Sequence, residues 1–178
     1  MQILKIRNRS NLKAWRNVVP AILFGTMLTT GCSSIDCNIN GRVMCHYALQ
    51  DGDGNNVQLQ YPLSVTFHRE HADSDTVYIN QQSNVASLDI PMSYNADTDE
   101  IALTLTIDQD TEITDVVRIT KTNIPQFESV DCAPRYHHEI EAVSSTHNFI
   151  DTVIVNNPKV SNNASVTNIY LRLRGSSN

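Results

Sequence analysis

The sequence has little glycine and tryptophan, and each shortage disfavours a class of function. Only 6 glycines and one tryptophan occur in 178 residues, and Trp15 lies in a segment that we expect to be removed. No Gly-x-Ser-x-Gly motif occurs, whereas nucleophile elbows and phosphate-binding loops usually rely on tight glycine turns. The sequence therefore gives no positive case for an enzyme, and we expect no catalytic residues and no cofactor.

Long hydrophobic runs and helical periodicity are also lacking. Residues 18–30 form a short apolar run that Pro20 and Gly25 interrupt, well short of the roughly 20 residues that span a bilayer. After residue 31, no long segment repeats its apolar residues with the period of a helix. We therefore expect the apolar run to be removed from the protein rather than retained as a membrane span.

The N-terminal segment has the order of a bacterial signal peptide. Residues 1–17 contain five basic and no acidic residues, the apolar run follows, and residues 28–32 read Leu-Thr-Thr-Gly-Cys. This pentapeptide resembles the lipobox of bacterial lipoproteins, in which the cysteine is acylated before cleavage, although its leucine lies one position early. We expect residues 1–31 to be a lipoprotein signal peptide and Cys32 to carry the lipid. The alternative is a secreted protein in which Cys32 is free.

Acidic residues predominate in the rest of the chain. Five of the 13 basic residues and none of the 19 acidic residues lie in residues 1–31, so residues 32–178 have a formal charge of 8 − 19 = −11. Such a chain repels phosphate backbones, and we expect no nucleic-acid binding. We expect contact with the membrane through the N-terminal lipid rather than by flat adhesion to anionic lipid.

If Cys32 is acylated, three cysteines remain. Cys37 and Cys132 each follow an aspartate in loop-like sequence, so we predict a disulfide between them, which would join the N-terminal segment to the far end of the domain. Cys45 shares the predicted inward face of a strand with apolar neighbours, which favours a buried free thiol. A bridge between Cys37 and Cys45 remains the alternative.

Apolar residues alternate with polar ones in most of the remaining segments, as in strands with one buried face and one wet face. These segments are residues 43–49, 59–67, 77–79, 88–90, 101–107, 113–120, 136–143, 150–155 and 169–173. Turn-forming clusters separate them. The pattern predicts an all-β fold, an antiparallel immunoglobulin-like β-sandwich of about eight strands. We expect residues 32–39 to be the lipid anchor and tether, and residues 40–178 to form a single domain.

Several segments resemble a family of small uncharacterised lipoproteins from Bacteroidota. The likeness is carried by residues 35–37, 90–94, 127–132, 138–143 and 150–158, and it covers most of the chain after residue 31. The resemblance implies export, acylation and pairing of Cys37 with Cys132. It implies no assigned activity, and members of the family are often encoded near a predicted outer-membrane barrel.

Candidate metal ligands are few. Residues 51–55, Asp-Gly-Asp-Gly-Asn, begin like a calcium loop, but Asn56 and Pro62 stand where an EF-hand needs a glycine and a bidentate acid. We interpret the cluster as a hairpin turn. His68 and His71, with neighbouring acids at positions 70 and 73, could contribute to a zinc site, yet an exposed polar loop is the favoured interpretation. We expect no metal.

The other histidines give no catalytic constellation. His137 and His138 are adjacent on a predicted strand and should point to opposite faces. His147 follows three hydroxyl residues at 144–146, which could suggest a nucleophile and its base, but no nucleophile elbow accompanies them.

Two functions of different classes remain as hypotheses. The first is a non-catalytic accessory or interaction module for an envelope β-barrel or assembly, and the alternative is a glycan-binding lipoprotein. We take the last strand to be a sheet edge whose Arg172 and Arg174 hinder uncontrolled pairing and could meet an acidic partner strand. Because Asp36 alone is a poor version of the acidic run that accompanies surface display, we expect an outer-membrane lipoprotein that faces the periplasm.

Overall fold

Strands make up all of the regular structure in the described part of the chain. The computed structural model describes residues 43–68, 75–127, 129, 132–161, 163 and 165–175. The ten strands among these residues are β1 (Met44–Gln50), β2 (Leu63–His68), β3 (Thr76–Gln82), β4 (Ser87–Pro91), β5 (Thr98–Thr106), β6 (Glu112–Gln126), β7 (Arg135–Ser145), β8 (Ile150–Val155), β9 (Lys159–Val160) and β10 (Ile169–Leu173). The all-β prediction is confirmed.

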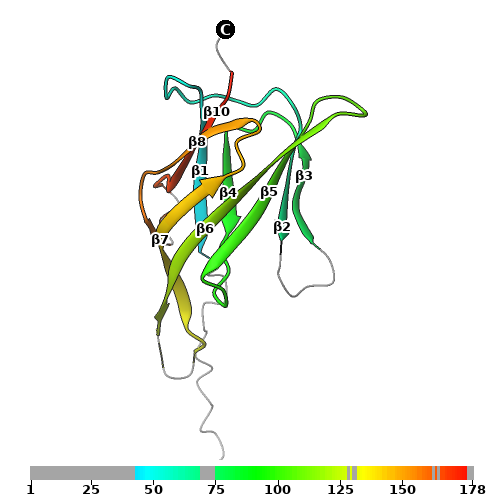
Figure 1. Cartoon of the computed structure of the whole chain (residues 1–178). Coiled ribbons are helices and arrows are strands. Elements are labelled where there is room, and N and C mark those ends of the chain that lie inside the picture. The colour runs from blue at the N-terminus through cyan, green and yellow to red at the C-terminus, as the bar shows by residue number, and fades with distance from the viewer. Residues whose placement is uncertain are drawn as a thin grey trace, which may run out of the picture. The chain divides into compact units, whose positions relative to one another are not determined.

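The strands form two sheets that pack face to face as a sandwich (Figure 1). The smaller sheet has the order β4-β1-β10-β8, and the larger has the order β3-β2-β5-β6-β7-β9. Within the larger sheet, β5, β6 and β7 follow one another as antiparallel neighbours, whereas the chain changes sheets after β1, before and after β4 and β8, and again before β10. The sandwich prediction is confirmed, with ten strands in place of about eight.

Alternating hydrophobicity explains why these segments form strands with one buried face. In β5, Ile101, Leu103 and Leu105 are buried while the residues between them are partly exposed. In β6, Val117 and Ile119 face the same interior. Side chains of this kind from both sheets form one hydrophobic cluster, so burial of alternate residues fixes which face of each strand points inward.

The last strand does not lie at an edge, and this corrects a sequence-based prediction. β10 lies between β8, which is antiparallel to it, and β1, which is parallel to it. The sandwich is therefore not wholly antiparallel. Arg172 is a half-buried residue of this inner strand, and Arg174 is exposed just beyond its end. Neither arginine guards a free edge, because both sides of β10 are already paired.

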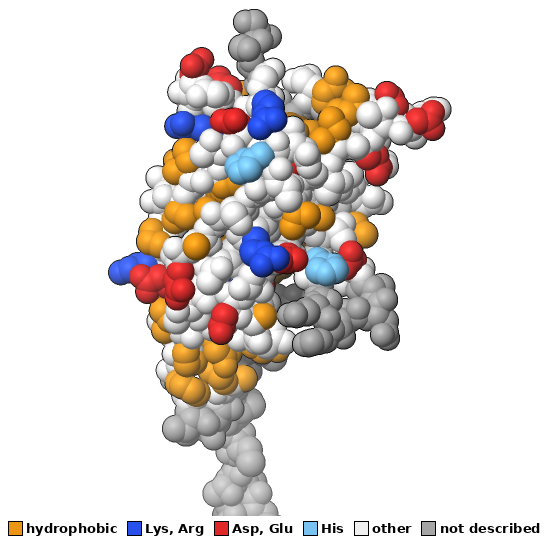
Figure 2. Space-filling model, viewed as in Figure 1, with side chains coloured by type: hydrophobic (Ala, Val, Ile, Leu, Met, Phe, Trp, Pro, Cys, Tyr) orange, Lys and Arg blue, Asp and Glu red, His pale blue; other side chains and the backbone are white. Residues whose placement is uncertain are grey.

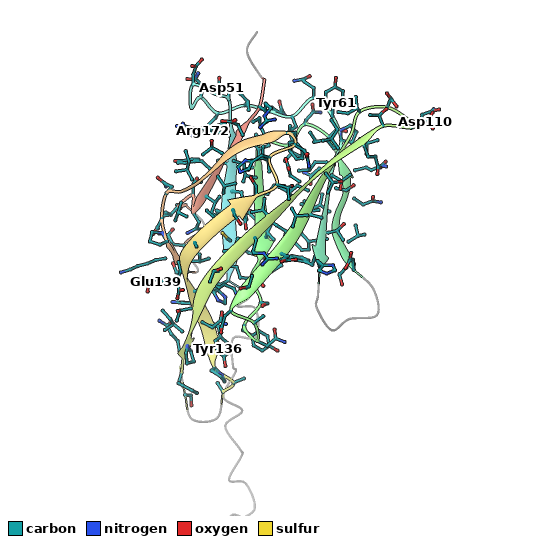
Figure 3. The ribbon with its side chains drawn as sticks, viewed as in Figure 1. Asp51, Tyr61, Asp110, Tyr136, Glu139 and Arg172 are labelled. Atoms are coloured by element: carbon teal, nitrogen blue, oxygen red, sulfur yellow. The ribbon has the colours of Figure 1, made fainter. Side chains whose placement is uncertain are left out.

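The two ends of the sandwich differ in chemistry. Asp51 follows the end of β1, and Asp110 precedes β6, and both lie at one end of the molecule, whereas Tyr136 lies at the other (Figure 3). β1 therefore starts near the Tyr136 end, where Met44 pairs with Pro91 of β4. This arrangement places the first described residue, Val43, close to the aromatic side chains described below.

Candidate functional site

The Asp51 cluster is a hairpin turn, as predicted. Gln50 and Asn56 form an antiparallel bridge across it, and the N–H groups of Asp53 and Asn55 donate to Asp51 Oδ1 at 3.0 and 2.8 Å. Hydrogen bonds from the side chain and then the backbone of Asn55 hold the pKa of Asp51 below its ordinary value. The carboxylate that begins the calcium-like motif is thus used to shape the turn.

The second predicted candidate for metal binding is only partly within the described residues. His68 Nδ1 lies 2.9 Å from Asp75 Oδ1, and both side chains are more than half exposed. His71 lies outside the described residues, as do the acids at positions 70 and 73. Among the residues that the structure does describe, no group of three or more His, Cys, Asp and Glu side chains is arranged to hold a metal ion.

A buried lysine lies at the centre of a polar cluster that the sequence analysis did not identify. The side chain of Lys121 on β6 is fully buried, and its Nζ is 3.4 Å from Asp99 Oδ2. Nζ also donates a hydrogen bond to the carbonyl oxygen of Ala96. Burial of a charged amine is tolerable only when such partners replace its water. Lys121 has the same phase as Val117 and Ile119, and this periodicity could have indicated its inward position.

His138 extends the cluster from the neighbouring strand β7. Its ring is buried, and Nδ1 is 2.8 Å from Oδ1 of Asn123 on β6. Burial, followed by the charge of Lys121, lowers the pKa of His138 to about 4. The imidazole is therefore neutral near pH 7, and it serves as a hydrogen-bonded core residue. His137 is half-buried and, as its neighbour on a strand, points to the opposite face.

Cys45 and Tyr47 complete the polar interior from β1. Both side chains are buried and hydrogen-bonded to each other. Burial is the main cause that raises the pKa of the Cys45 thiol to about 12 and the pKa of Tyr47 above its ordinary value. A thiol with this pKa is protonated near pH 7 and is a poor nucleophile. The prediction of a buried, free Cys45 is confirmed.

The alternative bridge between Cys37 and Cys45 is wrong, because Cys45 is free. Cys132 is disulfide-bonded. The cysteine that we predicted to pair with it, Cys37, lies outside the described residues, and so does Cys32. The pairing of Cys37 with Cys132 and the acylation of Cys32 therefore stay predictions.

The hydroxyl residues before His147 have a structural role around Asp115. The Asp115 carboxylate, fully buried on β6, accepts a hydrogen bond of 2.6 Å from the Thr146 hydroxyl. It also accepts the backbone N–H groups of residues 148, 149 and 150 at 2.7, 2.8 and 2.7 Å. Although burial raises the pKa of Asp115, these hydrogen bonds outweigh it and keep the pKa below its ordinary value. Asp115 thereby holds the turn between β7 and β8.

His147 and Ser145 do not form a nucleophile and base pair of good geometry. His147 Nδ1 is 3.3 Å from Ser145 Oγ and equally far from the carbonyl oxygen of Ile150. His147 adopts a positive φ of 58°, which belongs to the tight turn that Asp115 stabilises. The arrangement is that of a strand-to-strand connection.

An open flank runs along the edge strands β3 and β4. One side of β3 pairs with β2, and no described strand pairs with its other side. Val77 and Tyr78 of β3 are 58% and 42% exposed, and the Tyr78 ring packs edge-on against Phe67 at 5.6 Å. A shallow cavity of about 450 Å³ lies between the two edges, and its lining residues are Tyr78, Ile79, Gln82, Ser87, Leu88 and Asp89.

An apolar patch, which we call the aromatic end, lies near the start of β1. It comprises Tyr94, Phe127 and Tyr136, and Ile124 lies at the same end on the other face of the β6–β7 pair. Tyr94, Ile124 and Phe127 are 62%, 40% and 72% exposed, and the rings of Tyr94 and Tyr136 stack with their centroids 5.3 Å apart. Apolar side chains gather visibly at this end of the molecule (Figure 2). Such a group of exposed apolar residues is a candidate contact surface.

A model of a known protein family matches most of the described domain. The model of a family of unknown function, DUF6452, matches residues 63–173. The chain belongs to this family. The match covers β2 to β10 and so includes every strand of the described residues except β1. No curated protein and no solved structure matches the chain.

The expected resemblance to an uncharacterised family is therefore confirmed at the level of the domain. No helix among the described residues has the length and apolar character needed to cross a membrane. The domain boundaries predicted at residues 31 and 39 lie outside the described residues.

Proposed function

We propose that this member of the DUF6452 family is a non-catalytic lipoprotein of the outer membrane and an accessory module for an envelope β-barrel or assembly. The basic segment, apolar run and lipobox-like residues 28–32 support acylation of Cys32. With that anchor, the protein faces the periplasm and meets its partner at the membrane. Bacteroidota are the source that the sequence resemblance favours.

The open edge of β3 is the observation that carries the proposal. A seven-residue edge strand presents backbone N–H and C=O groups to which a partner strand can add. Val77 and Tyr78 add exposed apolar surface to that edge, and the cavity towards β4 offers room for a partner side chain. The occupant that fits this edge is an extended segment of an envelope protein.

The polar interior supports binding rather than catalysis as the role of the domain. Cys45 is held as a thiol and His138 as a neutral imidazole. Lys121 forms an ion pair with Asp99 and donates a hydrogen bond to a backbone carbonyl oxygen. These groups are engaged within the fold, and each has a structural function that accounts for its burial.

A pull-down of the tagged protein from cross-linked outer membranes tests the proposal. The Val77→Lys variant places a charge on the open edge and should lower recovery of the partner at least fivefold. Ile113→Lys is the matched control, because Ile113 is 36% exposed on the inner strand β6, and recovery should stay within twofold. Undiminished recovery with Val77→Lys would contradict the role of the β3 edge.

Glycan binding is the second candidate function, and the exposed rings of the aromatic end favour it. Sugar-binding platforms use exposed aromatic rings, and the stacked pair of Tyr94 and Tyr136 is a surface of this kind. Tyr61, although 45% exposed, lies at the opposite end of the molecule (Figure 3). A glycan array probed with the wild-type protein and with Tyr94→Ala tests this function, and binding that depends on Tyr94 would favour it over the accessory role.

A further inference from the structure

The position of the aromatic end relative to the start of the domain is informative. The Met92 N–H donates to the carbonyl oxygen of Val43, at 3.5 Å, and Tyr94 follows two residues later. Val43 comes 43 − 32 = 11 residues after Cys32. A chain of this length spans at most about 40 Å when fully extended. The first described residue and the aromatic end thus lie together, a short chain length from the predicted lipid.

The composition of the aromatic end suits the interface of a bilayer. Phe127 and Tyr94 are its most exposed members, and Ile124 adds aliphatic surface on the other face at the same end. Tyrosine and other aromatic side chains prefer the headgroup region, where an apolar ring and a polar tip are both accommodated. Behind this surface, the buried Lys121 of β6 is directed into the core and paired with Asp99.

The positions of two acidic turns favour the same orientation. The two acidic turns after β1 and before β6 contain Asp51, Asp53, Asp108 and Asp110, all in exposed or half-buried positions. They lie at the end of the molecule opposite Tyr136, as Asp51 and Asp110 show (Figure 3). A domain tethered by the aromatic end would keep these carboxylates away from the lipid surface.

We infer that the aromatic end rests on the interface of a zwitterionic bilayer and acts as a second, reversible membrane contact beside the lipid on Cys32. The inference rests on the acylation that is part of the proposed function. It goes beyond that function, because it fixes which end of the sandwich faces the membrane. The β3 edge, which runs along the flank, is then free to meet a partner within the envelope.

Fluorescence quenching tests the orientation. The full chain carrying Phe127→Trp is expressed in bacteria, extracted from membranes and reconstituted in vesicles of phosphatidylcholine and phosphatidylethanolamine with brominated acyl chains. Tyr61→Trp is the matched control, because it places an indole at an exposed position of the opposite end. Brominated lipid should quench the Phe127→Trp protein at least twofold more than the control. Equal quenching of the two proteins would overturn the inference.

Two further measurements separate this inference from its premise. Mass spectrometry of the purified protein shows whether Cys32 is acylated and residues 1–31, including Trp15, are absent. Acylated protein whose Phe127→Trp indole is unquenched would reject the membrane contact alone, while protein without acyl chains would reject the premise. An indole that is shielded from soluble quenchers and is also not quenched by brominated lipid would show that a second copy covers the aromatic end, which also overturns the inference.

Discussion

The two ends of the sandwich each hold an inward-facing aspartate, and they compensate its charge differently. Near the aromatic end, Asp99 is paired with the buried ammonium group of Lys121. Near the acidic turns, Asp115 has no cationic partner among the described residues and instead accepts one hydroxyl and three backbone N–H groups. One end thus uses an ion pair between neighbouring strands, and the other uses hydrogen bonds that shape a turn.

The two aspartates differ in how much backbone they hold in place. Donors to Asp115 come from Thr146 and from residues 148–150, so the carboxylate fixes the path of the chain from β7 to β8. Donors to Asp99 are Lys121 and the N–H of Ser93, at 3.2 Å, so this carboxylate connects side chains and a loop. Loss of either aspartate leaves buried partners unsatisfied, but more of them at the Asp115 end.

The largest effect is expected for Asp115→Ala. Four donors lose their acceptor, and three of them are backbone groups, so the free energy of unfolding should fall by about 4 kcal/mol. Urea unfolding followed by circular dichroism at pH 7 measures the change. The exposed Asp110 provides the control Asp110→Ala, which should change stability by less than about 0.5 kcal/mol. Comparable values for the two variants would mean that Asp115 does not hold the turn.

At the aromatic end, Asp99→Ala should destabilise the protein by about 3 kcal/mol, since removal of one partner leaves a buried charge uncompensated. The Lys121 ammonium group would keep only the carbonyl oxygen of Ala96 as a partner. The same unfolding experiment measures this effect. The exposed neighbour Asp97 serves as the control, and a cost for Asp99→Ala no larger than that for Asp97→Ala would show that the ion pair is dispensable.

His138 adds a dependence on pH that belongs to the aromatic end. Its pKa of about 4 in the folded protein lies below the ordinary value of 6.5, so the unfolded chain binds a proton first as the pH falls. Stability should be fully present above pH 6.5 and decrease between 6.5 and about 4, by on the order of 1 kcal/mol per pH unit. Urea unfolding at a series of pH values should show a flatter profile for His138→Gln. An unchanged profile would assign the dependence to other groups.

The smallest effects are expected for Arg172 and Arg174, which lie at the end of the molecule that holds the two acidic turns. Arg174 is exposed, and Arg174→Ala should cost less than about 0.5 kcal/mol. Arg172 packs its guanidinium against the turn, with Nη2 3.3 Å from the position that a Cβ on Gly54 would occupy, and its buried Nε has no hydrogen-bond partner. Arg172→Ala should therefore cost about 1 kcal/mol through lost packing. Thermal unfolding distinguishes these values, and a larger loss for Arg174→Ala would reverse the ranking.

Local patterns were sufficient to predict where the strands lie, and insufficient to predict which strands pair. The alternation in residues 101–107 and 113–120 corresponds to β5 and β6, because each such strand buries one face. The pairing of β1 with β10 joins segments from opposite ends of the domain. No local periodicity encodes that contact, and the expectation that Arg172 and Arg174 guard an edge was wrong for this reason.

The polar interior was not predicted from the sequence. Asp115 and Lys121 share the phase of Val117 and Ile119 on β6, and all four are buried. Their phase could have indicated an inward orientation, but the partners that make burial tolerable come from β5 and from the turn after β7. The turn at residues 51–55 was predicted correctly, since its hydrogen bonds are local.

The position of β10 imposes an order of assembly on the protein. β1 is the first described strand to be synthesised, yet one of its two neighbours is the last strand of the domain. Until β10 emerges, β1 and β8 lack their shared partner, and the smaller sheet cannot close. Pairing of segments so distant in sequence slows folding, because the loop must close before the contact is gained. A chain halted before β10 would therefore present two open strand edges to chaperones and to other unfinished chains.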